Sequence, residues 1–389
     1  MIIIKQEQTL GSSQKMRVAV IHSFYSSSKP SGENRVVEDQ VDALRAAGHE
    51  VLLVRQDTPE HQGAKFALRS GVNVALGRGI DPTRDLREFE PDIVHVHNLF
   101  PNFSNNWLRS WPSPIVLTLH NYRFACSKGI FYRSGNICTE CPDSGVIRST
   151  VHGCYRDSRL ATIPLAVSQH RRRHEVLDQA SAIITTSELS NEIVKRYLRP
   201  SVPTYVIPNF VDSDASYTVT NPPPRKWLAL GRFSPEKGFV ELIRDWPQDE
   251  ILTVIGDGEL RSEILNSATG KLVEVRSSVP RDELRELISD SFGLIFPSRW
   301  FESDPQVVAE SMRAGVPVVA FHANSAAHLV GSIGAGAVYS DSASLSAALD
   351  SVARDRPRMA RKAREEYFQR WTMQSWLTKV ENLYRHLLD

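Results

Sequence analysis

The sequence of 389 residues lacks the features of an exported or membrane-spanning protein. No apolar run approaches the roughly 20 residues that cross a bilayer, and residues 1–5 are too short for the apolar core of a signal peptide. Four cysteines in a chain of this length argue against a disulfide scaffold and for a reducing compartment. We therefore expect a cytoplasmic protein in which residues 1–15 form a flexible extension.

An excess of charge of either sign is also missing, since 46 Lys and Arg stand against 45 Asp and Glu. The net charge of +1 disfavours wholesale nucleic-acid binding, because proteins with that function carry a basic surface. Two loops of small residues, 26–32 and 256–261, lack the G-x-G-x-x-G spacing of a dinucleotide fingerprint. A nicotinamide or flavin enzyme is accordingly disfavoured, and any anion site has to be local.

Apolar periodicity predicts strands and helices that alternate in two series along the chain. The expected strands are 16–22, 50–54, 92–97, 114–120, 181–186 and 204–207, then 226–230, 251–255, 271–275, 292–296 and 316–320; the clearest helices are 33–47, 82–89, 160–177, 188–198 and the tail 343–389. The polar, proline-ending segment 209–224 separates the two series. The pattern predicts two doubly wound α/β domains, residues 16–208 and 209–372. Ligands of such sheets bind beyond the carboxyl ends of the strands, so we expect these two edges to face each other across a cleft.

Two glutamates lie around an expected helix start in the C-terminal third. Glu302 falls on the loop after an apolar strand, and Glu310 falls inside the next helix. Asp304 and Pro305 favour the helix start, because Asp caps backbone N–H groups and Pro suits the first turn. Gly315 is expected to end the helix. Two carboxylates placed in this way can hold one polyhydroxyl ligand from two sides.

Two cations, Arg232 and Lys237, lie on the glycine-bounded turn 231–238 after the first strand of the second domain. The turn leads into a helix N-terminus, which attracts anions. Lys supplies a point charge and Arg a planar fork of donors. We predict that this turn binds a diphosphate and stabilises it as a leaving group without a metal.

The order of these features resembles the retaining glycosyltransferases of family four, which have two Rossmann-like domains in the GT-B arrangement. The resemblance runs from about residue 16 to the C-terminus and rests on Gly32, His120, Asn209, the turn 231–238, residues 256–258, Glu302 and Glu310. It implies two facing domains, with the last helix, residues 373–389, crossing back to the N-terminal domain. It also implies transfer of a sugar from a UDP- or GDP-type donor to an acceptor hydroxyl, with retention at the anomeric carbon and no catalytic metal.

Position by position, the resemblance implies a role for each of these residues. Arg232 and Lys237 would hold the donor diphosphate, and Glu302 would contact the transferred sugar. The other implied contacts are Gly32 beside the diphosphate, Gly256 and Gly258 near the nucleobase, Glu310 at the ribose, Asn209 within the donor site and His120 beside the transferred sugar. His120, Arg232, Lys237 and Glu302 form the implied catalytic set. His95 and His97, on the preceding strand, are expected to be packed rather than catalytic.

The resemblance implies a front-face displacement, in which the departing diphosphate oxygen helps to take the proton of the acceptor. The two cations of the turn 231–238 would matter most as charge builds on that oxygen. One departure from the family is the segment 303–306, Ser-Asp-Pro-Gln, where many relatives have Gly-Phe or Asn-Phe. Unless Asp304 only caps the helix, it adds an acid beside the sugar pocket.

Other functions stay open at this point. A nucleotide-sugar or glycan binding protein without turnover would carry the same binding residues, and a nucleotide-sugar epimerase can share the architecture. A double-displacement glycosidase is the weaker interpretation, because it needs two carboxyl groups about 5 Å apart around the anomeric carbon. For a transferase, the acceptor is expected to be a glycan, a lipid-linked molecule or a small molecule, in the synthesis of a polysaccharide, glycolipid or other glycoconjugate.

All the cysteines lie in the stretch 121–157, directly after His120, and are spaced C-x11-C-x2-C-x12-C: Cys126, Cys138, Cys141 and Cys154. A C-x2-C pair with two further thiols suits a structural tetrahedral zinc, and a long irregular loop needs something to order it. Reduced, buried thiols and two disulfides are the alternatives.

The dense basic run 170–174, His-Arg-Arg-Arg-His, falls within the expected helix 160–177. A solvated helix face is the simplest interpretation. Ile163, Leu165 and Val167 lie just upstream, so residues 163–174 could instead rest on an anionic inner membrane face, where a lipid-linked acceptor is found.

Overall fold

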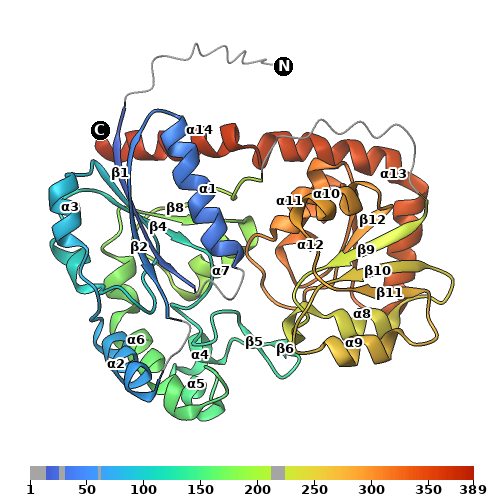
Figure 1. Cartoon of the computed structure of the whole chain (residues 1–389), viewed down its shortest axis with the longest axis horizontal. Helices are drawn as coiled ribbons and strands as arrows, with labels where there is room; N and C mark the ends of the chain where they lie inside the picture. The colour runs from blue at the N-terminus through green and yellow to red at the C-terminus, as the bar shows by residue number, and fades with distance from the viewer. Residues whose placement is uncertain (1–14, 26–30, 60–62, 212–223) are drawn as a thin grey trace.

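The computed structural model describes residues 15–25, 31–59, 63–211 and 224–389. They form two α/β domains that lie side by side, the N-terminal one mostly blue to green and the C-terminal one mostly yellow to orange (Figure 1). Three predicted segments fall wholly or partly outside the described residues: the extension 1–15, the small-residue loop 26–32 and the boundary segment 209–224.

The N-terminal domain has a six-stranded, fully parallel sheet in the order β2-β1-β3-β4-β7-β8. Its strands are β1 (Arg17–Phe24), β2 (Glu50–Asp57), β3 (Ile93–Asn98), β4 (Ile115–Leu119), β7 (Ala182–Thr185) and β8 (Thr204–Val206). Its helices are α1 (Gly32–Ala46), α2 (Ala64–Leu76), α3 (Thr83–Phe89), the 3-10 helix η1 (Asn106–Ser110), α6 (Arg159–Leu177) and α7 (Glu188–Tyr197). The predicted doubly wound domain is confirmed.

The C-terminal domain repeats the architecture with the parallel order β11-β10-β9-β12-β13-β14. Its strands are β9 (Lys226–Leu230), β10 (Ile251–Ile255), β11 (Val273–Arg276), β12 (Gly293–Phe296), β13 (Val318–Phe321) and β14 (Gly336–Tyr339). Its helices are η2 (Pro235–Lys237), α8 (Phe239–Asp245), α9 (Arg261–Ala268), α10 (Arg281–Ser289), α11 (Gln306–Arg313), α12 (Ser325–Ile333) and α13 (Ser342–Arg370). The chain order reverses between β9 and β12, the place where such sheets bind their ligands.

The cysteine-containing stretch is more regular than the sequence predicted. It contains the hairpin β5 (Tyr132–Arg133) and β6 (Asn136–Ile137), followed by α4 (Glu140–Ser144) and α5 (Ile147–His152). The expectation of an irregular loop was wrong, because elements of two to six residues are too short to produce a visible apolar period.

The last helix, α14 (Met373–Leu388), crosses back to the N-terminal domain, as the resemblance implied. In Figure 1 this red helix runs along the top of the molecule toward β1 and α1. It shares an apolar cluster with Val18 of β1 and Val37 of α1 through the buried side chains Trp376, Leu377, Val380, Leu383 and Tyr384.

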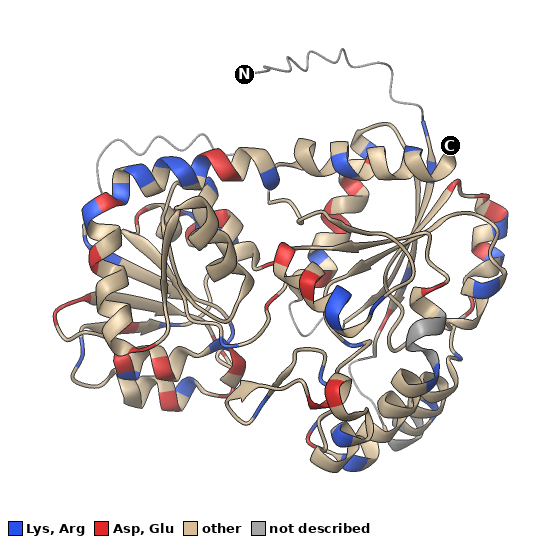
Figure 2. Ribbon diagram, turned by 180° about the vertical axis from the view of Figure 1, so that it is seen from behind, with Lys and Arg blue, Asp and Glu red and all other residues tan. Residues whose placement is uncertain are grey.

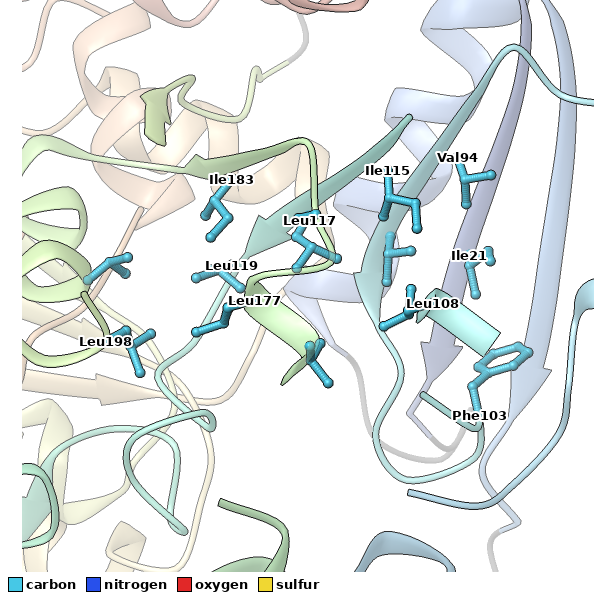
Figure 3. Close-up of a cluster of buried hydrophobic side chains, with 14 of the residues drawn as sticks. Ile21, Val94, Phe103, Leu108, Ile115, Leu117, Leu119, Leu177, Ile183 and Leu198 are labelled. Carbon is cyan, nitrogen blue, oxygen red and sulfur yellow. The ribbon is translucent and has the colours of Figure 1, made fainter. Parts of the chain in front are cut away.

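Both sheets are covered on both faces, which is why their strands are almost continuous apolar runs. Figure 3 shows part of the N-terminal core, a single apolar cluster that includes Ile21 of β1, Ile115 of β4 and Leu177 at the end of α6. Trp300 and Phe301, which follow β12, pack against the same core from the C-terminal domain. The two domains therefore touch through apolar side chains.

Candidate active site

An ion pair occupies the reversal point of the C-terminal sheet. Lys237, beyond the end of β9, places its Nζ 2.6 Å from Oε1 of Glu302, beyond the end of β12. The hydroxyl of Ser298 donates to the other carboxylate oxygen at 2.6 Å. Both charged side chains are mostly buried, at 17% and 13% exposure. The structure thus joins two residues that the sequence assigned to separate parts of one donor.

Gly238 allows this close approach. Its φ of +71° lies in the left-handed region, and a Cβ there would lie 2.4 Å from the carbonyl oxygen of Pro297. A backbone hydrogen bond also joins the turn to the loop after β12, because the N–H of Arg299 donates to the carbonyl of Glu236 at 2.9 Å. The turn carrying Lys237 therefore lies directly on the loop that carries Glu302.

Arg232 reaches outward from the same turn. Its side chain is 70% exposed, and its Nη2 donates to Oε1 of Glu236 at 2.9 Å. Ser234 donates to the same oxygen at 2.6 Å. Burial opposes ionisation of Glu236, but these hydrogen bonds outweigh it and lower the pKa of that carboxyl. Glu236 is therefore a carboxylate, and in this form it orients Arg232. The sequence analysis missed this partner of Arg232.

Gly256 and Gly258 pack against the turn 231–233. A Cβ on Gly256 would lie 1.9 Å from the carbonyl oxygen of Gly231, and one on Gly258 would lie 2.4 Å from that of Phe233. Two backbone hydrogen bonds join the loops. The N–H of Gly231 donates to the carbonyl of Ile255 at 3.0 Å, and the N–H of Phe233 donates to the carbonyl of Asp257 at 2.9 Å. These glycines position the Arg232 turn, and their implied proximity to a nucleobase stays a prediction.

Asp304 does not cap the helix, so that part of the prediction was wrong. Helix α11 begins at Gln306 with Pro305 at its N-cap and no side-chain cap. The Asp304 carboxyl group instead accepts the backbone N–H of Asn209 at 2.9 Å, and Pro305 takes the N-cap position in its place. Burial raises the pKa of Asp304 to about 7. Gly315 does follow the helix with a φ of +67°, as expected.

The remaining donor-site candidates lie on different elements. Asn209 accepts a hydrogen bond from Gln40 of α1 at 3.0 Å, so its amide connects the interdomain segment with the N-terminal domain. Glu310 lies buried on α11 with Arg281 at 3.4 Å. Gly32 is the first residue of α1, and among the described residues no atom lies within 4 Å of a Cβ built there. Its proximity to the diphosphate stays a prediction.

His120 follows β4 and faces the C-terminal domain. Its backbone carbonyl accepts the hydroxyl of Ser303 at 2.9 Å, and its Nε2 lies 2.9 Å from Nδ1 of His97. Burial, then the nearby His22 and His95, lower the pKa of His120 to about 3. His120 is therefore neutral at physiological pH and is suited to hydrogen bonding rather than to charge interactions. His95 and His97 are buried, as predicted.

A polar group beside Gly32 escaped the sequence analysis. Tyr25 donates to Oε2 of Glu33 at 3.4 Å, and Asn98 donates to the Tyr25 oxygen at 3.5 Å. Burial raises the pKa of Glu33 to about 7 despite the charge of Arg123. Tyr25 follows β1, Asn98 ends β3 and Glu33 lies in the first turn of α1. Their position at strand ends and a helix start was the one signal in the sequence that could have identified them.

The four cysteines form no disulfide, and Cys126 and Cys141 are buried. Burial, followed by the other three thiols, raises the pKa of Cys141 to about 12. Within the described ranges, no three His, Cys, Asp or Glu side chains are grouped closely enough to hold a metal ion. The structural zinc stays a prediction, and metal analysis of the purified chain tests it.

The predicted membrane-facing run on α6 is only partly exposed. Ile163 and Arg171 are exposed, but Leu165 points into the domain and is buried. The side chains of residues 172–175 are outside the described set. No helix in the described part of the chain is long and apolar enough to cross a bilayer.

Two family models match the chain, one on each domain. A glycosyl transferase 4-like domain matches residues 31–209, and glycosyl transferases group 1 matches residues 216–370. A GDP-mannose-dependent alpha-mannosyltransferase from Mycolicibacterium smegmatis is 26% identical over 344 residues, which cover 81% of this chain and 82% of the relative.

Solved structures share the fold over nearly the whole chain. Sucrose-phosphate synthase from Thermosynechococcus elongatus has a TM-score of 0.68 at 17% identity, with 96% of this chain and 99% of that chain covered. HepE from Anabaena, solved with UDP-glucose, has a TM-score of 0.58 at 16% identity, with 95% and 100% covered. From its two domain matches and this two-domain GT-B architecture, the chain belongs to the group 1 glycosyltransferases.

Proposed function

We propose that this protein is a retaining, metal-independent glycosyltransferase that moves a sugar from a nucleoside diphosphate donor, bound between the domains, to an acceptor hydroxyl. The observation that carries the proposal is the Lys237–Glu302 ion pair at the reversal point of the C-terminal sheet. A cation for the leaving diphosphate and a carboxylate for the sugar lie side by side there, as transfer requires.

In the proposed reaction, the acceptor oxygen bonds to the anomeric carbon as the bond from that carbon to the diphosphate oxygen breaks. The electron pair leaves with the diphosphate, and the acceptor proton passes to the same oxygen. The products are the glycoside and the nucleoside diphosphate. Lys237 has three N–H donors and uses one on Glu302, so two suit the diphosphate. Exposed Arg232 supplies the second cation.

The N-terminal domain closes the other side of the proposed site. Ser303 bonds the His120 carbonyl, which brings the loop of Glu302 against the end of β4. A neutral His120 imidazole can accept or donate a hydrogen bond at a sugar hydroxyl. Glu302 would hold other hydroxyls of the same sugar, and Glu310 would hold those of the ribose.

GDP-mannose is the first donor to test, because the mannosyltransferase relative uses it by name. UDP-glucose is the second, because HepE was solved with it. Thermal stabilisation by GDP-, UDP- and ADP-sugars ranks the candidates. Nuclear magnetic resonance of the product then reads the anomeric configuration, and an inverted product would contradict retention.

The proposed role of Lys237 at the donor diphosphate is tested by Lys237→Ala. Loss of one charge-stabilising donor typically lowers kcat by about 10²- to 10³-fold, and we expect that loss here. The melting temperature should fall as well, because the mostly buried Glu302 loses its partner, so activity is measured below the unfolding transition of the variant. Lys226→Ala, at the opposite end of β9 and exposed, is the matched control and should keep full activity. Full transfer activity in the Lys237 variant would contradict the assignment of Lys237 to the diphosphate. Donor binding without sugar release by the wild type would favour the binding-protein alternative.

A further inference from the structure

The hairpin of β5 and β6 reaches from the N-terminal domain to the turn that carries Lys237. In Figure 1 it lies between the two domains, and Figure 2 shows it from behind, with a basic position on the hairpin and acidic positions on α4, the next helix. The hydroxyl of Tyr132 on β5 donates to the carbonyl of Pro235 at 3.0 Å. Tyr132 is buried, and burial, followed by the charge of Glu241, raises the pKa of its hydroxyl. The hydroxyl therefore stays protonated and donates at neutral pH.

The carbonyl of Pro235 closes the turn from which Lys237 projects. Pro235 is the first residue of η2, and its carbonyl also accepts the N–H of Gly238, the residue that ends η2, at 3.4 Å. A carbonyl oxygen has two lone pairs, so it can accept both hydrogen bonds. Lys237 lies between these two residues in the chain. The Tyr132 hydroxyl therefore holds the turn at the group that fixes the backbone of Lys237.

The preceding residue, Phe131, contacts the loop that carries Glu302. Its ring centroid lies 6.2 Å from that of Phe301, which comes directly before Glu302 in the chain. On the other side the same ring packs against Tyr122 at 5.2 Å and Tyr197 at 5.6 Å, both in the N-terminal domain. Two consecutive residues of the hairpin segment thus contact the two loops whose side chains form the ion pair of the candidate site.

The backbone of Phe131 is strained. Its φ of +50° lies in the left-handed region, which is rare for a bulky side chain and persists only where the surroundings hold it. Here the ring is fully buried, and the N–H of Cys138 donates to the Phe131 carbonyl at 2.8 Å. Consecutive side chains of a regular strand point to opposite faces, so the left-handed residue is what lets Phe131 and Tyr132 both contact the C-terminal domain. Strain of this kind gathers at functional positions.

The hairpin is also fixed to its own domain. Its two turn residues, Ser134 and Gly135, have φ of +49° and +84°, and positive φ at both residues is the conformation that closes a two-residue hairpin. Arg133 of β5 pairs with Glu140 of α4, and Nε2 of His152 on α5 lies 2.9 Å from the same carboxyl group. The hairpin is thus connected to two helices of the N-terminal domain while its aromatic residues contact the C-terminal one.

We propose that Tyr132 is a positioning residue for sugar transfer. Through the Pro235 carbonyl it holds the turn of Arg232 and Lys237 in a fixed position relative to the N-terminal domain. Without this hydrogen bond the donor contacts within the C-terminal domain remain, but the turn can move as charge builds on the leaving diphosphate, and its cations then stabilise that charge less well. This inference rests on the proposed glycosyl transfer and adds a residue of the N-terminal domain to the support of the donor site.

Tyr132→Phe tests this role, because it removes only the hydroxyl and keeps the ring. Release of the nucleoside diphosphate from GDP-mannose, or from UDP-glucose if the wild type uses that donor, gives kcat, and calorimetric titration gives the affinity for free GDP or UDP. We expect kcat to fall by roughly three- to tenfold, the effect of losing one hydrogen bond between neutral groups, with an unchanged nucleotide affinity. Tyr205→Phe, half-buried on the edge strand β8, removes the same group elsewhere and should keep the wild-type kcat.

Hydrogen–deuterium exchange of the full chain measures the turn itself. In Tyr132→Phe we expect residues 235–238 to exchange roughly threefold faster or more, while strand β10 exchanges as in the wild type. An unchanged kcat, or unchanged exchange of the turn, overturns the positioning role. Equal losses of kcat and of nucleotide affinity also overturn it, because they would show damage to the donor site. If the wild type releases no nucleoside diphosphate from any nucleotide sugar, the proposed function fails instead, and the exchange measurement still decides whether Tyr132 holds the turn.

Discussion

The charged residues of the candidate site restrain one another before any ligand arrives. Lys237 lies on Glu302, Arg232 lies on Glu236, and Ser298 holds the second oxygen of Glu302. A donor that enters meets cations already oriented by carboxylates, which reduces the reorganisation needed as charge develops. The ion pair is mostly buried, so removing one partner leaves an uncompensated charge.

Glu302→Gln separates binding of the diphosphate from recognition of the sugar. The amide keeps the shape of the side chain but frees Lys237 from its carboxylate. We expect the nucleoside diphosphate to bind at least as tightly as in the wild type, and transfer to fall by roughly a hundredfold. Calorimetry and initial rates measure the two effects. Glu263→Gln, on the exposed face of α9, should change neither, and equal losses of both in Glu302→Gln would refute the division of roles.

Two glycines of the site are predicted to respond differently to alanine. Gly32→Ala adds a methyl group that meets no atom of the described residues, so the melting temperature should hold or rise slightly while transfer falls. Gly256→Ala drives a methyl group into the Gly231 carbonyl and should lower the melting temperature by several degrees. Thermal denaturation and transfer assays measure both variants. A stable, fully active Gly32 variant would show that no ligand approaches that position.

At the scale of elements, α14 holds the two domains in one unit. It leaves the C-terminal domain after α13 and buries an apolar face against β1 and α1. Its polar anchor is Tyr384, whose hydroxyl lies 2.6 Å from Nδ1 of His95 on β3, while Thr118 of β4 lies 2.7 Å from the other ring nitrogen. This anchor satisfies both nitrogens of a fully buried imidazole.

Tyr384→Phe should destabilise the protein through that anchor. The phenylalanine keeps the packing but leaves one nitrogen of His95 buried without a partner, at a cost of about 1–3 kcal/mol. Urea denaturation at neutral pH measures the difference in unfolding free energy. Leu388→Ala, exposed on the same helix, should change it by less than about 0.5 kcal/mol. A Tyr384 variant as stable as the wild type would mean that water or another group satisfies the imidazole.

Across the whole molecule, polar contacts between the domains add to the apolar contact that Trp300 and Phe301 make with the N-terminal core. Ser303 meets the His120 carbonyl, and the Tyr132 hydroxyl donates to the carbonyl of Pro235 at 3.0 Å. Asp304 meets the backbone of the interdomain segment, where its pKa is raised by burial from about 3.8 to about 7. Such polar contacts can break and re-form as a cleft between two domains opens for its substrates and closes on them.

The raised pKa of Asp304 leads us to predict that closure of the two domains depends on pH. With its pKa raised in the closed form, the protonated acid favours closure, and this contribution is lost as the pH rises from about 4 to about 7. Asp304→Asn stays neutral at every pH. Small-angle scattering should give equal radii of gyration for the two proteins at pH 5 and a larger radius for the wild type at pH 8. Equal radii at pH 8 would exclude Asp304 as the source of any opening.

Much of the fold was predictable because buried parallel strands are apolar runs with clear ends. The strands at 226–230 and 251–255 were predicted to the residue. Helix α2 was missed, since Gly71 and two valines weaken its helical signal. Strand β14 was missed because it is short and begins with Gly336, whose hydrogen fits against the carbonyl of Val318 at a distance where a Cβ would clash.

The candidate site was predictable as a set of residues but not as an arrangement. Lys237 and Glu302 were both expected at the donor, yet their ion pair joins positions 65 residues apart and depends on β9 and β12 being neighbours. Asp304 illustrates the converse: a local capping rule predicted that it caps the helix, but in the folded chain it bonds the Asn209 N–H, 95 residues away in sequence.

The sequence by itself determined the two α/β domains, the turn with its two cations and the family, because apolar period and motif order are properties of the linear chain. Only the tertiary structure decided that Lys237 pairs with Glu302 and that Asp304 meets the interdomain segment. These contacts depend on which strands and helices become neighbours, and that choice is made by packing the whole core at once.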